Sequence, residues 1–303
     1  MDREDWKALK ASVKKVCRSF TFHSRKRRYS FELVLLMYLW IVAHRRPLYK
    51  ACQRCTYGDW FRPRKLPSVS QFCRRVKEEV FEKLLLAVHL DLIGSGHQSP
   101  VKVVDGKPLL VSPVSKDPDA RSGHITGGFG KGYRLHAMIS EKRRILIWSV
   151  MPLNVAEQSV AVELAWHLKP AEMQSLVLAD SNYDSGRLHK ALDQSNHRLL
   201  TPLKGQQRVK DGKHHPVTLR QMGPERRQAV EVWKNHQDLA NYVLKDRIRI
   251  ENLFSGITMA LDAGGPPPWV RRLERVRRWA GAIVILHNVR QNVREKTATS
   301  KAA

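Results

Sequence analysis

The chain has 303 residues, 42% of them hydrophobic, so it can bury a core and is not a wholly disordered protein. Its 54 lysines and arginines outnumber its 28 aspartates and glutamates, and the net charge of +26 favours a polyanionic partner such as nucleic acid. The longest apolar stretch, residues 31–43, contains Glu32 and is too short to span a bilayer. Because the first residues also lack the order of a secretory signal, we expect an intracellular, cytoplasmic protein.

Residues 1–95 are expected to form a helical N-terminal region. The i, i+3, i+4 spacing of a buried helix face recurs at Phe31, Val34, Leu35, Tyr38, Leu39 and Val42. A shorter helix follows Ser68, with Val69, Phe72 and Val76 expected to face inward. Its polar and basic side chains are Gln71, Arg74 and Arg75. These residues suit the DNA-contacting helix of a helix-turn-helix, and the alternative is a surface helix with solvated charges.

The same region contains all four cysteines. Cys52 and Cys55 have the spacing of half a zinc site, but Cys17 and Cys73 each stand alone in the sequence. Since a structural zinc site usually has two close pairs, reduced thiols are favoured over a zinc site.

After a linker at residues 95–100, the pattern changes to short apolar runs separated by turn signals. Strands are predicted over residues 101–111, 133–140, 145–153, 175–180 and 197–203. Helices are predicted over 156–168 and 185–195, and loops at 127–130 and around 211–212. Three consecutive strands followed by alternating helices and strands indicate an α/β fold with a mixed sheet flanked by helices.

The remainder of the chain is expected to be mostly helical. Residues 204–241 are polar and weakly periodic, and they are predicted to be an insertion before a helix that contains Glu251. Three prolines at 266–268 precede a basic helix predicted over 269–294, and residues 295–303 are expected to form a flexible tail. The catalytic domain is therefore expected to extend over residues 101–294.

Three acids stand in settings that suit catalysis. Asp105 and Asp180 each end an apolar strand, where functional groups gather at the carboxyl edge of a sheet. Glu251 lies beside the apolar face of a later helix. Three clustered carboxylates repel one another unless cations neutralise them, and their oxygen atoms favour Mg²⁺ or Mn²⁺. The sequence thus predicts a two-metal site for phosphoryl transfer.

Each acid also has a simpler interpretation. Asp105 precedes a glycine and can be a turn residue, and Asp180 can cap the next helix. Glu251 can pair with Arg247 at i, i+4 spacing. Only their order and joint settings favour a shared site.

Four sequence blocks in this order resemble the transposase DDE domain of bacterial insertion sequences, which has an RNase H-like fold. The blocks are Val104–Gly106, Lys131–His136, Leu178–Ser185 and Arg247–Phe254. Some positions depart from the pattern that many members share. A tyrosine and a lysine of the third block are replaced by Leu244 and Thr258. The two residues that follow the second aspartate also differ from the shared pattern, and here they are Ser181 and Asn182. The three acids themselves are intact.

The resemblance implies a DNA transposase that binds the terminal inverted repeats of its element and catalyses cleavage and strand transfer. It implies two Mg²⁺ ions held by the three acids, with Mn²⁺ as a substitute, and double-stranded DNA as element ends and target. It also implies a homo-oligomer on DNA, close to the bacterial nucleoid. Two alternatives are a metal-dependent nuclease of the same fold and an inactive, transposase-derived DNA-binding protein.

Additional DNA contacts are expected beside the acids. Lys131 and Arg134 flank Tyr133, an arrangement that can grip a phosphate backbone and stack on a base, or simply belong to a basic edge strand. Arg247 can hold a phosphate near the metals or form an exposed ion pair with Glu251.

Overall fold

The computed structural model describes residues 1–20, 28–202, 222–261 and 264–302. The chain forms two compact units. The first contains residues 1–94, 114–119 and 256–303, and the second contains residues 95–113 and 120–255. The predicted loop at 211–212 and residues 204–221 of the predicted insertion lie outside the described residues. No helix among the described residues is long and apolar enough to cross a membrane.

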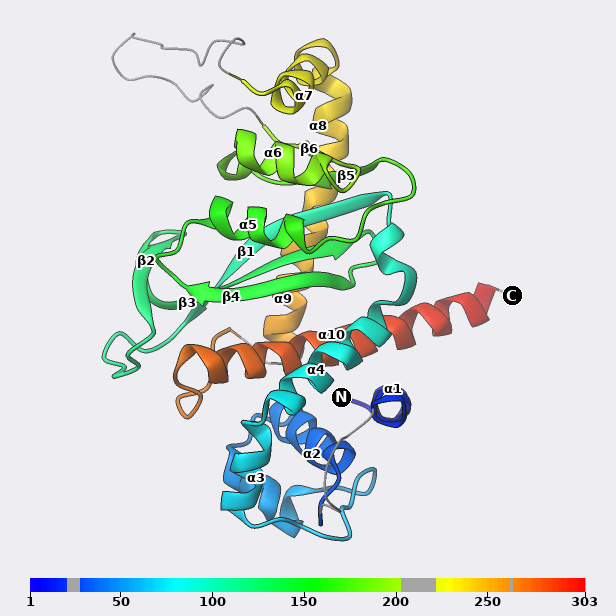
Figure 1. The fold of residues 1–303 in the computed structure, drawn as a ribbon, viewed down its shortest axis with the longest axis vertical. Coiled ribbons are helices and arrows are strands. Elements are labelled where there is room, and N and C mark those ends of the chain that lie inside the picture. The colour runs from blue at the N-terminus through cyan, green and yellow to red at the C-terminus, as the bar shows by residue number, and fades with distance from the viewer. Residues whose placement is uncertain (21–27, 203–221, 262–263, 303) are drawn as a thin grey trace. The chain divides into compact units, whose positions relative to one another are not determined.

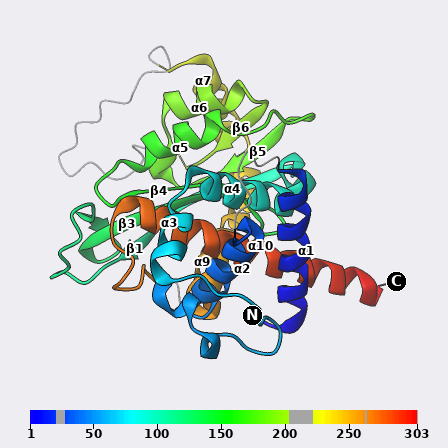
Figure 2. The same cartoon turned by 60° about the horizontal axis from the view of Figure 1, so that its bottom comes forward.

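The first unit is built from helices. They are α1 (Arg3–Ser19), α2 (Phe31–Ala43), α3 (Val69–Val76), α4 (Glu79–Ile93), the second half of α9 (Ile248–Leu261) and α10 (Leu273–Ala302), with short 3-10 turns at Leu48–Cys52 and Arg54–Thr56. The apolar helix α2 contacts α1, α3, α4 and α10 (Figure 2). Almost every side chain of α2 is buried, because these neighbours cover it on several sides. The sequence pattern had indicated only one buried face.

The helix α10 begins later than the sequence pattern predicts. Arg272 has a positive φ of 74°, which interrupts the chain after the three prolines. The backbone N–H of Arg272 donates to the Asp117 carboxylate at 3.0 and 3.2 Å, and that of Leu273 donates to Asp119 at 2.8 Å. Two carboxylates thus satisfy the first N–H groups of α10 and offset its positive end. The helix continues to Ala302, over the residues expected to form a tail.

The second unit contains a mixed sheet of six strands (Figure 1). The strands are β1 (Val101–Leu110), β2 (Arg121–Ile125), β3 (Gly128–Ser140), β4 (Ile145–Pro152), β5 (Ser175–Leu178) and β6 (His197–Leu200). Their order is β2-β3-β1-β5-β6, and β4 pairs with the second part of β3. β3 is antiparallel to β1, β2 and β4, whereas β5 and β6 run parallel to β1. The prediction of a mixed sheet flanked by helices is confirmed.

Both faces of the sheet are covered. On one face, Val104, Met138 and Val177 pack against α5 (Glu157–Trp166) and α6 (Gly186–Asp193) in one hydrophobic cluster. On the other face, the first half of α9 buries Ile250, Leu253 and Phe254 (Figure 1). The ammonium of Lys107 in β1 lies 5.9 Å from the centre of the Phe254 ring. Two further helices, α7 (Pro224–Asn235) and α8 (Gln237–Leu244), precede α9.

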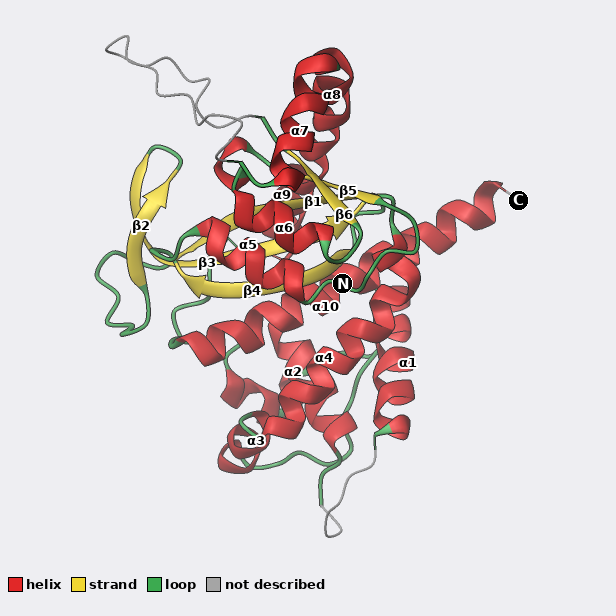
Figure 3. Cartoon of the chain, turned by 45° about the horizontal axis from the view of Figure 1, so that its top comes forward, coloured by secondary structure: helices red, strands yellow, loops and turns green. Residues whose placement is uncertain are grey.

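The sequence analysis did not predict β2, and it placed the start of β3 too late. Residues 127–130 were expected to be a loop, but Gly128–Gly130 begin β3, which forms a hairpin with β2 (Figure 3). Thr126 and Gly127 make the turn, and Gly127 and Gly128 have φ values of 88° and 144° that favour glycine. The hairpin is rich in glycine and poor in β-branched residues, so its composition resembles that of a loop.

Candidate active site

The pairing of β1 with β5 brings two of the predicted acids together. Val103 pairs with Leu178 in parallel register, so Asp105 and Asp180 each follow the same pair by two residues. Since side chains alternate along a strand, both carboxylates lie on the face that α9 covers. β5 ends at Leu178, and Asp180 accepts a hydrogen bond from the backbone N–H of Asn182 at 2.9 Å. Asp180 therefore caps the short turn Ser181–Tyr183 rather than α6, whose cap is Ser185.

Asp105 is a largely buried carboxylate beside other acids. The pKa of Asp105 is raised to about 6, mainly by burial and to a smaller extent by the charges of Asp180 and Glu157, while the Gly106 N–H and Arg247 oppose the shift. The Gly106 N–H donates to Asp105 Oδ1 at 2.8 Å. The positive charge near Asp105 therefore does not fully compensate the cost of ionising it.

Arg247 connects the third acid to the first. Its guanidinium donates to Glu251 Oε1 at 2.8 Å, and another of its nitrogens lies 3.8 Å from Asp105 Oδ2. The Glu251 side chain is half exposed, and that of Arg247 is less so. The ion pair expected as the simpler interpretation of Glu251 is therefore present, and the same cation also faces Asp105.

The donor set has the chemistry of a magnesium site, since it offers carboxylate oxygens from two strand ends and a helix. In the described part of the chain, however, no three histidine, cysteine, aspartate or glutamate side chains are grouped closely enough to hold a metal ion. Arg247 lies within ion-pair distance of both Asp105 and Glu251. A divalent cation would thus compete with this guanidinium for the same two carboxylates.

A fourth acid, Glu157, is a neighbour that the sequence analysis missed. It begins α5 and forms an ion pair with the buried Arg134, whose other nitrogen donates to the His124 carbonyl at 2.5 Å. Burial and the charges of Glu157 and Asp105 raise the pKa of the fully buried Tyr183 hydroxyl. The sequence signal that could have indicated Glu157 is an acid in the first turn of the helix that follows β4.

The basic and aromatic block in β3 divides between the two faces of the sheet. Tyr133 is fully buried and pairs with Leu109, so its ring has no face open for stacking on a base. Arg134 is buried on the opposite face, in its ion pair with Glu157. Lys131 is half-buried, and the exposed aromatic ring of this strand is Phe129.

The candidate DNA-contacting helix, α3, is capped as predicted. Ser68 and Gln71 form a capping box, so the Gln71 amide oxygen accepts from the Ser68 N–H at 3.0 Å. Arg74 is exposed. Arg75 donates to the Tyr29 carbonyl at 3.0 Å, lies 3.3 Å from Glu78, and stacks over the Phe31 ring. Val69, expected inside, is exposed.

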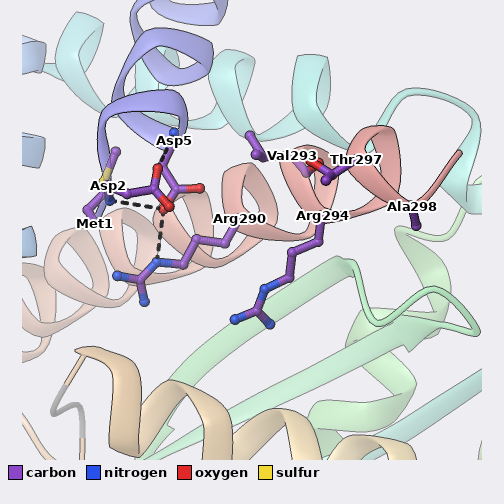
Figure 4. A pocket seen from close by; sticks show the side chains of 8 residues that line it. All are labelled: Met1, Asp2, Asp5, Arg290, Val293, Arg294, Thr297 and Ala298. Atoms are coloured by element: carbon purple, nitrogen blue, oxygen red, sulfur yellow. Dashed lines mark hydrogen bonds and ion pairs between the residues drawn. The ribbon is translucent and has the colours of Figure 1, made fainter. Parts of the chain in front are cut away.

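The described cavities do not contain the three acids. An open pocket of about 790 Å³ lies between α5 and α6, next to Gln158, Trp166 and Lys190. Another, of about 700 Å³, lies in the first unit where α1 meets α10 (Figure 4). There Asp5 lies 3.5 Å from Arg290, so the pocket has mixed charge. The four cysteines are free thiols.

Comparison with known proteins identifies the class to which this fold and site belong. The family model of the transposase DDE domain matches residues 96–288, which is well over half of the chain. The chain therefore belongs to the transposase DDE domain family, and its α/β fold is of the RNase H-like class that the sequence blocks imply.

Among solved structures, the chain is similar to a piggyBac transposase in a synaptic complex with hairpin DNA. The sequence identity is 9% and the TM-score is 0.48, over 99% of this chain and 74% of that chain. A comparison with curated proteins finds no match.

Proposed function

We propose that this protein is a DNA transposase that binds the terminal inverted repeats of its element and catalyses metal-dependent cleavage and strand transfer. The observation that supports this most is the register of β1 and β5, which sets Asp105 beside Asp180 in a member of the transposase DDE domain family. Arg247 connects this pair to Glu251. The net charge of +26 supports DNA as the substrate and partner.

Asp105, Asp180 and Glu251 would together hold two Mg²⁺ ions, with Mn²⁺ as a substitute. When bound, the ions would activate the attacking hydroxyl and stabilise the charge on the leaving oxygen. The raised pKa of Asp105 supports this assignment, because a buried carboxylate with surplus negative charge around it gains most from a cation.

The reaction consists of two in-line displacements at phosphorus. In the first, the oxygen of water forms a bond to phosphorus, the P–O3′ bond breaks, and the leaving oxygen takes a proton to become a 3′-hydroxyl. In the second, this hydroxyl attacks a target phosphodiester and displaces its 3′ oxygen. Arg247 is free to transfer from the carboxylates to a DNA phosphate once they bind cations, because a guanidinium pairs equally well with both anions.

Other contacts would hold the element ends and the target. Gln71, Arg74 and Arg75 of α3 were the candidates in the N-terminal region, and exposed Arg74 retains the strongest case. Lys131 is the candidate on the sheet, whereas Tyr133 and Arg134 have buried, structural positions. Paired element ends would require a homo-oligomer, acting in the cytoplasm at the bacterial nucleoid.

A strand-transfer assay with labelled element ends tests the proposal. With Mg²⁺, the protein should release cut ends and join them to target DNA. Asp105→Asn, Asp180→Asn and Glu251→Gln should each lower both yields by at least about 100-fold, a usual loss when one electrostatic group of a catalytic site is removed. Asp193→Asn is the matched control, because Asp193 pairs with Arg198 at 2.8 Å in the same unit.

The outcomes separate the alternatives. Cut ends without joined product would identify a nuclease instead of a transposase. Full biological function of the Asp105→Asn protein would show that the chain is a DNA-binding protein whose role does not need catalysis.

A further inference from the structure

We infer that the β2–β3 hairpin is a binding platform for unpaired DNA bases on the sheet that carries the candidate active site, an inference that rests on the proposed function. The platform is defined by four residues: Ser122, His124, Phe129 and Lys131. Pairing in the hairpin sets Ser122 opposite Lys131 and His124 opposite Phe129, so all four share one face. Figure 3 shows this hairpin at the edge of the sheet.

The opposite face of the hairpin contains three glycines, at 123, 130 and 132, that pack closely on the protein. A Cβ at Gly123 would overlap the carbonyl oxygen of Leu153, and one at Gly130 would lie 2.8 Å from Leu110 Cδ2. A Cβ at Gly132 would overlap the Leu109 carbonyl oxygen. The absence of side chains at these three glycines lets the hairpin approach the protein closely, with the platform turned outward.

The outward face exposes an aromatic pair. The Phe129 ring is 72% exposed, and its centre lies 4.1 Å from that of the exposed His124 ring. An exposed phenylalanine contributes little to folding, but its ring suits stacking on a nucleobase, which also has two flat faces. Tyr133, the aromatic residue that the sequence pattern suggested for this role, is buried four residues further along β3.

Charge and strand phase favour DNA as the occupant. Residues 120–140 contain Arg121, Lys131 and Arg134 but no acidic residue. Since side chains alternate along β3, Phe129 and Lys131 lie on the same face as Ala137, which pairs with Asp105. A protein partner would find little apolar area on this platform, because Phe129 is its only large apolar side chain.

A buried ion pair fixes the hairpin relative to the acids. Arg134 donates to the His124 carbonyl at 2.5 Å and pairs with Glu157, whose charge raises the pKa of Asp105. The position of the aromatic pair is therefore coupled to the catalytic edge of the sheet. An unpaired strand that extends from the acids along β3 would bring its bases to this platform.

The test measures binding by fluorescence anisotropy in Ca²⁺ with the full-length Asp105→Asn protein, which separates binding from cleavage. One probe is a blunt duplex, and the other carries a short unpaired tail with 2-aminopurine. Phe129→Ala should weaken binding of the tailed probe about tenfold and abolish the quenching of 2-aminopurine, while duplex binding stays within twofold. Phe129→Trp should retain both signals. Met173→Ala, which truncates another exposed apolar side chain of the same unit, should change neither.

A second variant tests the phosphate contact. Lys131→Gln should reduce the slope of log affinity against log salt on the tailed probe by about 0.7, the value for one phosphate contact on a single strand. Equal affinity of wild type and Phe129→Ala for the tailed probe, or an equal loss on both probes, would overturn the inference. A wild-type chain that is active in the strand-transfer assay would show that only the platform fails and that the proposed function stands.

Discussion

Asp105 shows how a buried carboxylate can be costly to the fold that holds it. It is largely buried, it lies near Asp180 and Glu157, and Arg247 approaches it only to 3.8 Å. Its pKa of about 6 lies above the ordinary value of 3.8, so the folded state disfavours the charged form. This cost is absent at low pH and grows as pH rises from about 4 to 6, and it stays constant above that.

Asp105→Asn is therefore expected to stabilise the metal-free protein. In EDTA at pH 8, the free energy of unfolding in urea should rise by about 1–3 kcal/mol, since one pKa unit corresponds to about 1.4 kcal/mol. The gain should shrink as pH falls below 6. Asp193→Asn, at a partly exposed ion pair, should change the free energy by less than about 1 kcal/mol. A variant less stable than wild type at pH 8 would show that the Asp105 charge is compensated.

The three acids could be predicted as a candidate site because each stands at a boundary that local pattern reveals. Asp105 and Asp180 follow apolar runs, and Glu251 follows a helical spacing. Glu157 was missed because its importance comes from Arg134 and Tyr183, which approach it only in the folded sheet. The burial of Tyr133 was also hidden, because the sequence does not reveal which face of β3 is covered.

At the scale of elements, a buried ion pair holds α7 to the segment that carries Asp180. The Asp184 carboxylate, 2% exposed, accepts hydrogen bonds from Arg226 at 2.8 and 2.7 Å. His189 of α6 lies 3.5 Å from the same carboxylate. Asp184 follows directly after the turn Ser181–Tyr183, so the pair restrains the loop between Asp180 and α6.

Removing one partner of the Arg226–Asp184 ion pair should lower the free energy of unfolding more than removing both. Arg226→Met is expected to lower the free energy of unfolding by about 3 kcal/mol, because the Asp184 charge stays buried without its guanidinium. The double variant Arg226→Met, Asp184→Asn should recover part of this loss. A double-mutant cycle in urea measures the difference, with Arg198→Met as a control at the partly exposed Asp193 pair. Additive effects would contradict a direct coupling between the two side chains.

The strands were predicted correctly where an alternating or continuous apolar pattern determines the structure. They were not predicted where close packing of the backbone determines it. β1, β4 and β5 have apolar runs that match their observed positions to within a few residues. The β2–β3 hairpin depends instead on glycines at 123, 130 and 132, whose lack of side chains permits close packing against Leu153, Leu110 and Leu109. No hydrophobic periodicity marks such a contact.

For the whole molecule, the charge of +26 predicts strongly salt-dependent binding to DNA of any sequence. Each lysine or arginine that contacts a phosphate releases counterions, and about six contacts would lower the affinity about 1000-fold between 50 and 200 mM salt. Anisotropy with a duplex of arbitrary sequence measures this slope. A flat response would indicate that the charge serves another partner. Composition predicted this property but not the division of the chain into two units.

That division decides how the protein tolerates shortening. Residues 114–119 lie between β1 and β2 in the sequence, yet Asp117 and Asp119 belong to the unit of α10 and supply the acceptors for its first N–H groups. A product that ends at residue 255 would lose α10 and leave these carboxylates without their donors. A product that begins at residue 95 would strip α10 of α1, α2 and α4 and expose its buried side chains. Loss of either end therefore damages the core of the first unit, and no single cut of the chain separates the two units.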